Sequence, residues 1–128
     1  MVGKKSIAEL AAEARARIPE IDPDGLAARC ATGSCLHIDV REPDEWAKAR
    51  IPGSVLVPLG SLEREVAAKA FSGTVAPADL DRPIVVSCAK GFRSLVGADQ
   101  LRAMGFTNVV SLRGGIEAWM QSGRAVER

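Results

Sequence analysis

The chain has 128 residues, the length of one ordinary domain, of which 47% are hydrophobic and 26% charged. A chain of this size and composition can bury a core without disulfides or metals, so an intrinsically disordered protein is excluded. Seventeen basic side chains against sixteen acidic ones leave a net charge of +1. Such a balance gives no general attraction for nucleic acid or for an anionic membrane. Any preference for an anionic ligand must therefore arise locally.

The N-terminal region predicts one helix over residues 6–17. Ser6 and Glu9 have the spacing of a capping box, and apolar residues recur along one face of the segment. We expect this helix to be an extension, residues 1–19, attached to a main domain of residues 20–128. Packing on the main domain is favoured over docking a partner or a second copy.

The remainder of the chain alternates short strands with helices. Strands are predicted at residues 36–40, 55–57, 84–87 and 109–112. Helices are predicted at residues 23–29, 43–48, 61–71, 94–104 and 115–121, with a loop at 72–82. The segment Ile84-Val85-Val86-Ser87 is apolar without alternation, as expected when helices cover both faces of a sheet. This pattern predicts a three-layer α/β/α fold with a mainly parallel central sheet of about five strands.

Features that indicate location and cofactors point to a soluble, cofactor-free protein. No apolar run reaches the roughly 18 residues that span a bilayer, and charges interrupt any signal-like segment near the start. We therefore expect a cytoplasmic protein without a membrane or nucleic-acid partner. Three cysteines, an odd number, fit reduced thiols better than a disulfide framework. Cys30 and Cys35 match no common metal spacing, and with a single histidine no metal site is expected.

The segment with the strongest chemical signal begins at Cys88, directly after a predicted strand, and ends where a helix is predicted at Ser94. Ligands of open α/β sheets bind beyond the carboxyl ends of the strands. Free N–H groups and the dipole of a following helix favour an anion there, and hence a reactive thiolate. Gly91 allows the loop to turn N–H groups inward, while Lys90 and Arg93 add positive charge. These features favour a nucleophile over a buried structural cysteine, although the latter is the commoner fate of cysteine.

Three segments carry a resemblance to a known family. Cys88-Ala89-Lys90-Gly91-Phe92-Arg93-Ser94 resembles the Cys-x-x-Gly-x-Arg-Ser active-site loop of single-domain rhodaneses. Residues 38–46, followed by Ile51-Pro52-Gly53-Ser54, resemble the first signature of that family, and residues 112–119 resemble its closing one. The resemblance extends from about residue 20 to the end. One departure is Ala49-Arg50, where family members often have Gly-His.

The resemblance implies a two-step sulfur transfer. A small anionic donor such as thiosulfate passes its outer sulfur to Cys88, and the resulting persulfide is discharged by cyanide, a thiol or a protein acceptor. The implied substrate-binding groups are Ala89, Lys90, Gly91, Phe92, Arg93, Ser94 and Arg41. Arg41, at the end of the first strand, either borders the pocket or forms an ion pair. A monomer or weak dimer is expected.

Two other functions stay open. One is a sulfur-relay or protein-binding module that uses the same fold to dock an acceptor protein. The other is a phosphatase or arsenate reductase. Those enzymes are related to the rhodaneses but have a loop of seven residues from cysteine to arginine, whereas the loop from Cys88 to Arg93 has six. We expect structural roles for His37 and Asp39. Trp46 and Trp119 are expected to fill the core, and Phe92 to be exposed at the loop tip.

Overall fold

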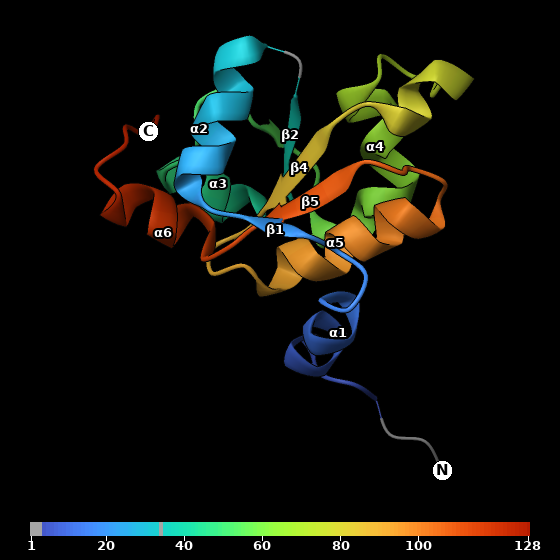
Figure 1. The fold of residues 1–128 in the computed structure, drawn as a ribbon, viewed down its shortest axis with the longest axis horizontal. Helices are drawn as coiled ribbons and strands as arrows, with labels where there is room; N and C mark the ends of the chain where they lie inside the picture. Colours follow the sequence, from blue (N-terminus) through green and yellow to red (C-terminus); the bar gives the residue numbers. More distant parts are fainter. Residues whose placement is uncertain (1–3, 34) are drawn as a thin grey trace.

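The computed structural model describes residues 4–33 and 35–128 (Figure 1). Five parallel strands form a single sheet in the order β1-β5-β4-β2-β3. The strands are β1 (Glu20–Ile21), β2 (Leu36–Asp39), β3 (Val55–Leu56), β4 (Ile84–Ser87) and β5 (Val109–Leu112). The helices are α1 (Ile7–Ala14), α2 (Pro23–Thr32), α3 (Pro43–Lys48), α4 (Leu62–Ala70), α5 (Phe92–Ala103) and α6 (Gly115–Gln121). The predicted α/β fold with a parallel sheet is confirmed.

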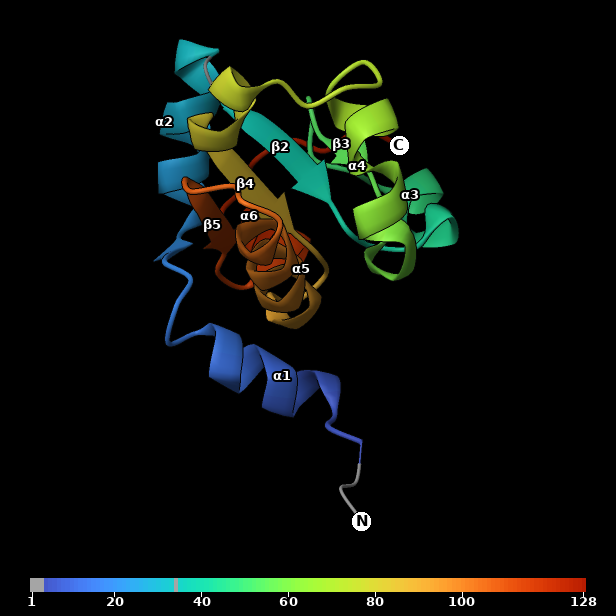
Figure 2. The same cartoon turned by 90° about the vertical axis from the view of Figure 1, so that its right-hand side faces the viewer.

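Helices cover both faces of the sheet (Figure 2). On one face Val86 of β4 belongs to a hydrophobic cluster that includes residues of α1, α4 and α5. On the other face Val85 belongs to a cluster with residues of α2 and α6. Since successive strand residues point to opposite faces, the unalternating apolar run of β4 supplies both clusters. Among the described residues, no helix combines the length and apolar character needed to cross a membrane.

The N-terminal helix α1 packs against α5, as predicted, and lies beneath it in Figure 2. Its first turn is closed by the predicted capping box, in which Ser6 Oγ accepts from the Glu9 N–H and a Glu9 carboxylate oxygen accepts from the Ser6 N–H, both at 3.1 Å. Ala11 and Ala14 are buried in the shared core. The apolar stripe is only partly buried, because Ile7 stays exposed at the start of the helix.

The structure differs from the expected elements in several details. Helix α1 ends at Ala14 instead of residue 17, and α2 extends to Thr32 instead of residue 29. The two-residue strand β1 was not predicted; it exists only by pairing with β5 and is too short to show a hydrophobic period. Helix α5 begins at Phe92, two residues before the predicted start, because Gly91 adopts a left-handed conformation (φ 101°) and acts as its N-cap. A short 3₁₀ helix, Pro77–Asp81, interrupts the predicted loop at 72–82.

The expectation that both tryptophans fill the core is correct for Trp119 and wrong for Trp46. Trp119 is buried against the sheet and its indole N–H donates to the Ala125 carbonyl at 2.9 Å. Trp46 is half-buried, and the guanidinium carbon of Arg50 lies 5.3 Å from its ring centroid. The Arg50 Nε also lies 3.7 Å from Glu127 Oε1. Its side chain therefore belongs to this cation–π and ion-pair cluster.

Candidate active site

Cys88 lies at the carboxyl end of β4, where the chain turns into α5. Its sulfur accepts hydrogen bonds from the backbone N–H groups of Gly91, at 3.1 Å, and of Ser94, at 3.3 Å. The positive φ of Gly91 turns the loop back so that these amides point at the sulfur. The residue is only 1% exposed. A sulfur held by inward-directed N–H groups at a helix start is placed where negative charge is stabilised.

Two buried hydroxyls extend from the sulfur into the protein. The Cys88 sulfur lies 3.4 Å from Ser94 Oγ, which in turn lies 2.7 Å from Ser111 Oγ. Both serines are fully buried. A hydroxyl can donate to a thiolate or accept from a thiol, so Ser94 can follow either state of the sulfur. Sequence analysis missed Ser111; the only signal was its position in β5, where parallel pairing sets it opposite Val86.

The N-terminal turn of α6 holds the first two carbonyls of the loop. The Ile116 N–H donates to the Cys88 carbonyl at 2.9 Å, and the Glu117 N–H donates to the Ala89 carbonyl at 3.2 Å. This approach requires glycine at position 115, since a Cβ there would overlap backbone atoms of Cys88 and Ala89. Gly115 therefore allows α6 to pack closely against the loop.

Arg93 braces the loop against α3. Its two terminal nitrogens donate to the two carboxylate oxygens of Glu45 at 2.7 and 2.9 Å. The Arg93 hydrogen bonds lower the pKa of Glu45 to about 2, and the same pair raises the pKa of Arg93. This bidentate pair neutralises Arg93, whereas Lys90 is exposed and forms no ion pair with any residue in 4–33 or 35–128. Of the two loop cations, Lys90 is thus the one available to a ligand.

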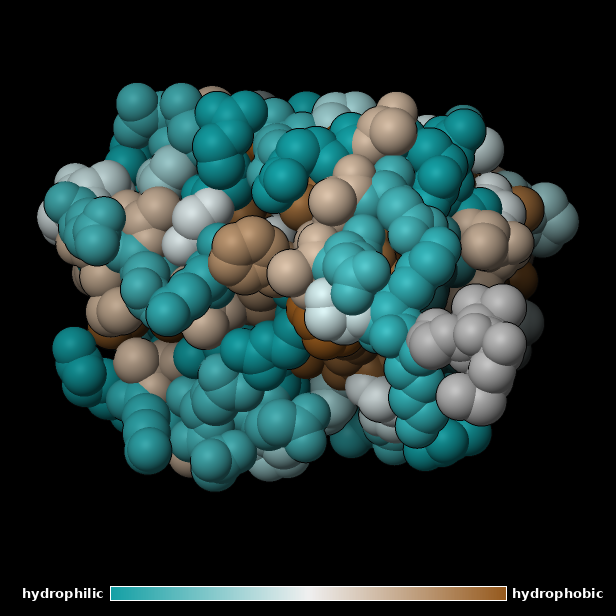
Figure 3. All heavy atoms as spheres, turned by 90° about the horizontal axis from the view of Figure 1, so that it is seen from below, coloured by the Kyte–Doolittle hydropathy of each residue, from teal (hydrophilic) through white to brown (hydrophobic). Residues whose placement is uncertain are grey.

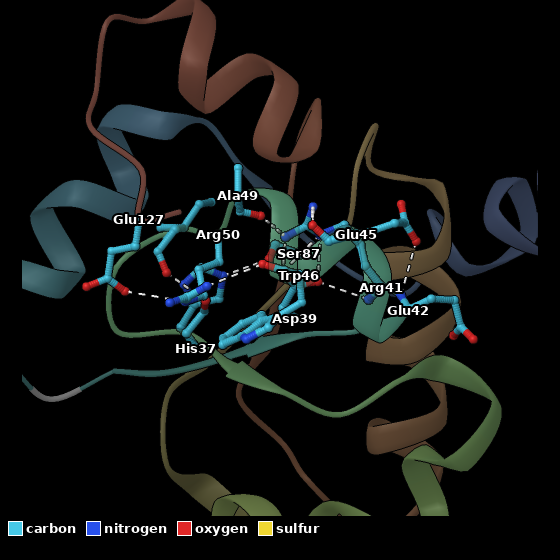
Figure 4. A network of polar contacts seen from close by, with 12 residues as sticks. His37, Asp39, Arg41, Glu42, Glu45, Trp46, Ala49, Arg50, Ser87 and Glu127 are labelled. Atoms are coloured by element: carbon cyan, nitrogen blue, oxygen red, sulfur yellow. Dashed lines mark hydrogen bonds and ion pairs between the residues drawn. The ribbon is translucent and has the colours of Figure 1, made fainter.

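Arg41 takes the ion-pair alternative (Figure 4). It does not line the pocket that opens over Cys88. Its guanidinium donates to both carboxylate oxygens of Asp39, with distances from 2.8 to 3.1 Å, and to the carbonyls of Glu45 and Ala49. The Asp39 carboxylate also accepts from the Arg41 backbone N–H at 2.9 Å. Asp39 and Arg41 are 2% and 4% exposed, so no donor of this pair faces solvent. The geometry favours a structural role for Arg41 over the expected substrate-binding one, and it fits the structural role predicted for Asp39.

His37 is buried in β2 as a packed and hydrogen-bonded residue. Its Nε2 lies 2.7 Å from Ser87 Oγ, and its Nδ1 has no hydrogen-bond partner within residues 4–33 and 35–128. Burial lowers the pKa of His37 to about 4, which keeps the ring neutral at physiological pH. The geometry fits the predicted structural role.

The other two thiols have environments unlike that of Cys88. Cys30 is exposed on α2 and Cys35 is half-buried. Burial raises the pKa of both thiols. A raised pKa favours the protonated thiol, which is the less nucleophilic form of cysteine.

A pocket of about 350 Å³ opens over Cys88. Its lining residues come from the loop and from the first turn of α1: Ile7, Cys88, Ala89, Lys90, Phe92 and Arg93. Phe92 is 46% exposed, as predicted for the loop tip. Figure 3 views the molecule from the side of α1 and shows hydrophobic atoms recessed among hydrophilic ones. Ile7 was not predicted here, because only the packing of α1 on α5 brings it to the loop.

Comparisons with known proteins agree with this geometry. The model of the rhodanese-like domain family matches residues 22–122. A sulfurtransferase of Allochromatium vinosum is 32% identical over 107 residues, which cover 83% of this chain and 92% of that protein. The thiosulfate sulfurtransferase GlpE of Stutzerimonas stutzeri is 35% identical over 82 residues, or 64% of this chain and 67% of that protein.

A solved structure resembles nearly the whole chain. It is a Rhodopseudomonas palustris protein of unknown function, described as a possible tyrosine phosphatase, with a TM-score of 0.81 and 26% identity. The match covers 99% of this chain and 98% of that one, so it includes the N-terminal helix. Together with the family match over residues 22–122, these similarities show that the chain belongs to the rhodanese-like domain family.

Proposed function

We propose that the protein is a sulfurtransferase that carries sulfane sulfur as a persulfide on Cys88. The observation that supports this most strongly is the pair of backbone N–H groups, from Gly91 and Ser94, that point at the Cys88 sulfur. They favour negative charge on that atom while it is a thiolate. The sulfurtransferase relatives support the same class of reaction.

The first half-reaction loads the enzyme. The Cys88 thiolate attacks the outer sulfur of thiosulfate, a new S–S bond forms, and the electron pair of the broken S–S bond leaves with sulfite. Lys90 attracts the anionic donor, and the N–H groups of the loop stabilise the persulfide anion. Arg93 acts through Glu45 by holding the loop in shape. No redox partner is needed, because one S–S bond forms while another breaks and the released electron pair stays on sulfite.

The second half-reaction unloads the enzyme. A thiophilic acceptor, cyanide or a thiol, attacks the outer sulfur of the persulfide, and the bonding pair returns to Cys88 as a thiolate. Covalent catalysis of this kind predicts ping-pong kinetics. The six-residue span from Cys88 to Arg93 favours sulfur over a phosphate-sized oxyanion. A relay to an acceptor protein is the second candidate, favoured by the exposed Phe92 beside the pocket.

An intact-mass experiment tests the proposal. The protein is incubated with thiosulfate, its mass is recorded, and cyanide is then added while thiocyanate is measured. We expect a gain of one sulfur atom that cyanide removes, absent in Cys88→Ala and retained in the matched variant Cys35→Ala. Slow discharge to cyanide but fast discharge to a protein thiol would favour the relay. Absence of the mass gain in the wild type, or its retention in Cys88→Ala, would refute the proposal.

A further inference from the structure

The pocket above Cys88 has an apolar side that inorganic thiosulfate does not use. Its volume of about 350 Å³ is roughly ten times the ~30 Å³ that one water molecule occupies in the liquid, so a five-atom anion fills only part of it. Ile7 and Phe92 are large apolar residues of this lining, and they are 41% and 46% exposed. Exposed apolar side chains that share a pocket offer a surface for an apolar group of a ligand.

Ile7 is held in place by the packing of its helix. The capping box of Ser6 and Glu9 fixes the turn in which Ile7 lies. Ala11 and Ala14 anchor α1 in the core, and Arg17, just beyond the helix, donates to both Asp99 carboxylate oxygens at 2.9 and 2.6 Å. The first turn of α1 is therefore a built wall of the pocket, and a ligand meets the Ile7 side chain in a set position.

The charges around the pocket favour an anionic head next to the reactive sulfur. Lys90 lines the pocket without an ion pair among the residues that the structure describes, whereas the guanidinium of Arg93 is occupied by Glu45. The pocket thus combines a nucleophilic sulfur, one available cation and an apolar wall. A ligand that satisfies all three has an anionic sulfane sulfur group joined to an apolar organic group.

We propose that Ile7 of α1 is a specificity-determining residue that selects organic sulfane-sulfur donors carrying an apolar group over inorganic thiosulfate. The proposal rests on the sulfur-transfer function proposed above. With a thiosulfonate R–SO₂–S⁻, the Cys88 thiolate forms a bond to the outer sulfur, the S–S bond of the donor breaks, and its electron pair leaves with the sulfinate R–SO₂⁻. The reaction is that of thiosulfate with an organic group in place of one anionic oxygen, so the donor carries one charge fewer and releases a sulfinate instead of sulfite. These intrinsic differences are the same for every variant of the protein, so a change in the donor preference between variants reports the contacts of R.

The test compares two donors that pass on the same outer sulfur, benzenethiosulfonate and thiosulfate, in the wild type and in variants. The second-order rate constant of persulfide formation on the full chain is measured for each donor by intact mass, and their ratio is taken. We expect the wild type to favour benzenethiosulfonate. Ile7→Ala should lower the ratio of the benzenethiosulfonate rate constant to the thiosulfate rate constant about three- to tenfold. A closed hydrophobic pocket discriminates by roughly tenfold or more per missing methylene, and an open one discriminates less. Leu10→Ala is the matched control, since Leu10 is also exposed on α1 but does not line the pocket.

The outcomes separate this inference from the proposed function. A lower ratio in Ile7→Ala with an unchanged ratio in Leu10→Ala supports the inference. An unchanged ratio in Ile7→Ala, an equal fall in Leu10→Ala, or a wild type that favours thiosulfate overturns the inference while sulfur transfer stands. A wild type that loads sulfur from neither donor overturns both. Ile7 is exposed, so the variant should fold, and thermal unfolding of each variant verifies this.

Discussion

Two loops at the same edge of the sheet contain charged side chains, and they use them in opposite ways. At the end of β2, Asp39 of the strand and Arg41 just beyond it pair with each other and are buried. After the adjacent strand β4, the loop amides point at the Cys88 sulfur and Lys90 stays exposed. Charge at the carboxyl edge of a parallel sheet is therefore not enough to mark a site. The difference lies in whether the donors are already satisfied within the protein.

The largest expected effect comes from breaking the closed pair after β2. Asp39→Ala should lower the free energy of unfolding by about 3–5 kcal/mol, because it leaves the buried Arg41 guanidinium without its counter-charge. The measurement is urea unfolding of the variant and the wild type at neutral pH. The folded fraction should still load sulfur, since Arg41 lies outside the pocket. Loss of loading in protein that remains folded would show that the two loops are coupled.

The second effect is a pH dependence from His37, the residue of β2 bonded to Ser87. Its pKa is about 4 in the folded protein and 6.5 ordinarily, so between these values the unfolded chain binds the additional proton. Stability should therefore fall as the pH drops from 6.5 to about 4, by about 3 kcal/mol in total. Urea unfolding at several pH values measures this slope, and His37→Gln should remove it. A slope that persists in His37→Gln would assign the titration to another group.

The third effect concerns the support of the Cys88 loop by α6. Gly115→Ala places a Cβ against the backbone of Cys88 and Ala89, so the loop or the helix must move. We expect a stability loss of about 1–3 kcal/mol from overpacking. The rate of persulfide formation should fall about 100-fold, because a shift of about 1 Å in reacting groups has that effect. Gly123→Ala is the control, as glycine 123 also has positive φ but nothing lies near its Cβ position.

The smallest effect is expected for the partly exposed brace between Arg93 and Glu45. Because the pKa of Glu45 is lowered from 4.5 to about 2, the pair stabilises the fold above pH 4.5, and this contribution is lost as the pH falls toward 2. Each side chain is about 30% exposed, so the contribution is limited to about 0–1 kcal/mol. Glu45→Gln should lower the rate of persulfide formation by a larger factor than it lowers the folding equilibrium constant. The reason is that Arg93 then loses the ion pair that holds the Cys88 loop against α3. An equal loss of stability in Glu45→Gln and Asp39→Ala would contradict the difference expected between the partly exposed pair and the buried pair.

The predictable parts of the molecule are those set by neighbours in sequence. The capping box of α1, the strand β4 and the turn at Gly91 all depend on residues a few positions apart. The structure has all three, although α5 begins at Phe92 instead of Ser94. The role of Arg41 was harder to predict, because an arginine at a strand end can either border a pocket or form an ion pair. The ion pair is favoured by the carbonyls of Glu45 and Ala49, which accept from the Arg41 guanidinium and whose positions follow from the turn of α3.

The unpredictable parts depend on contacts between distant segments. Ser111 reaches Ser94 only because β5 pairs with β4, and Ile7 reaches the pocket only because α1 packs on α5. The salt bridge between Arg17 and Asp99 joins residues 82 positions apart. Neither periodicity nor motif spacing contains this information, because these contacts are made by the assembled sheet and helices.

The most direct test of the account is a crystal structure of the thiosulfate-treated protein. We expect one added sulfur on Cys88 Sγ, inside the pocket, at hydrogen-bond distance from backbone N–H groups of the loop between Ala89 and Ser94. The same electron density should be absent from Cys30 and Cys35. An added sulfur on either of those residues, or a Cys88 persulfide turned away from the loop amides, would contradict the central claim.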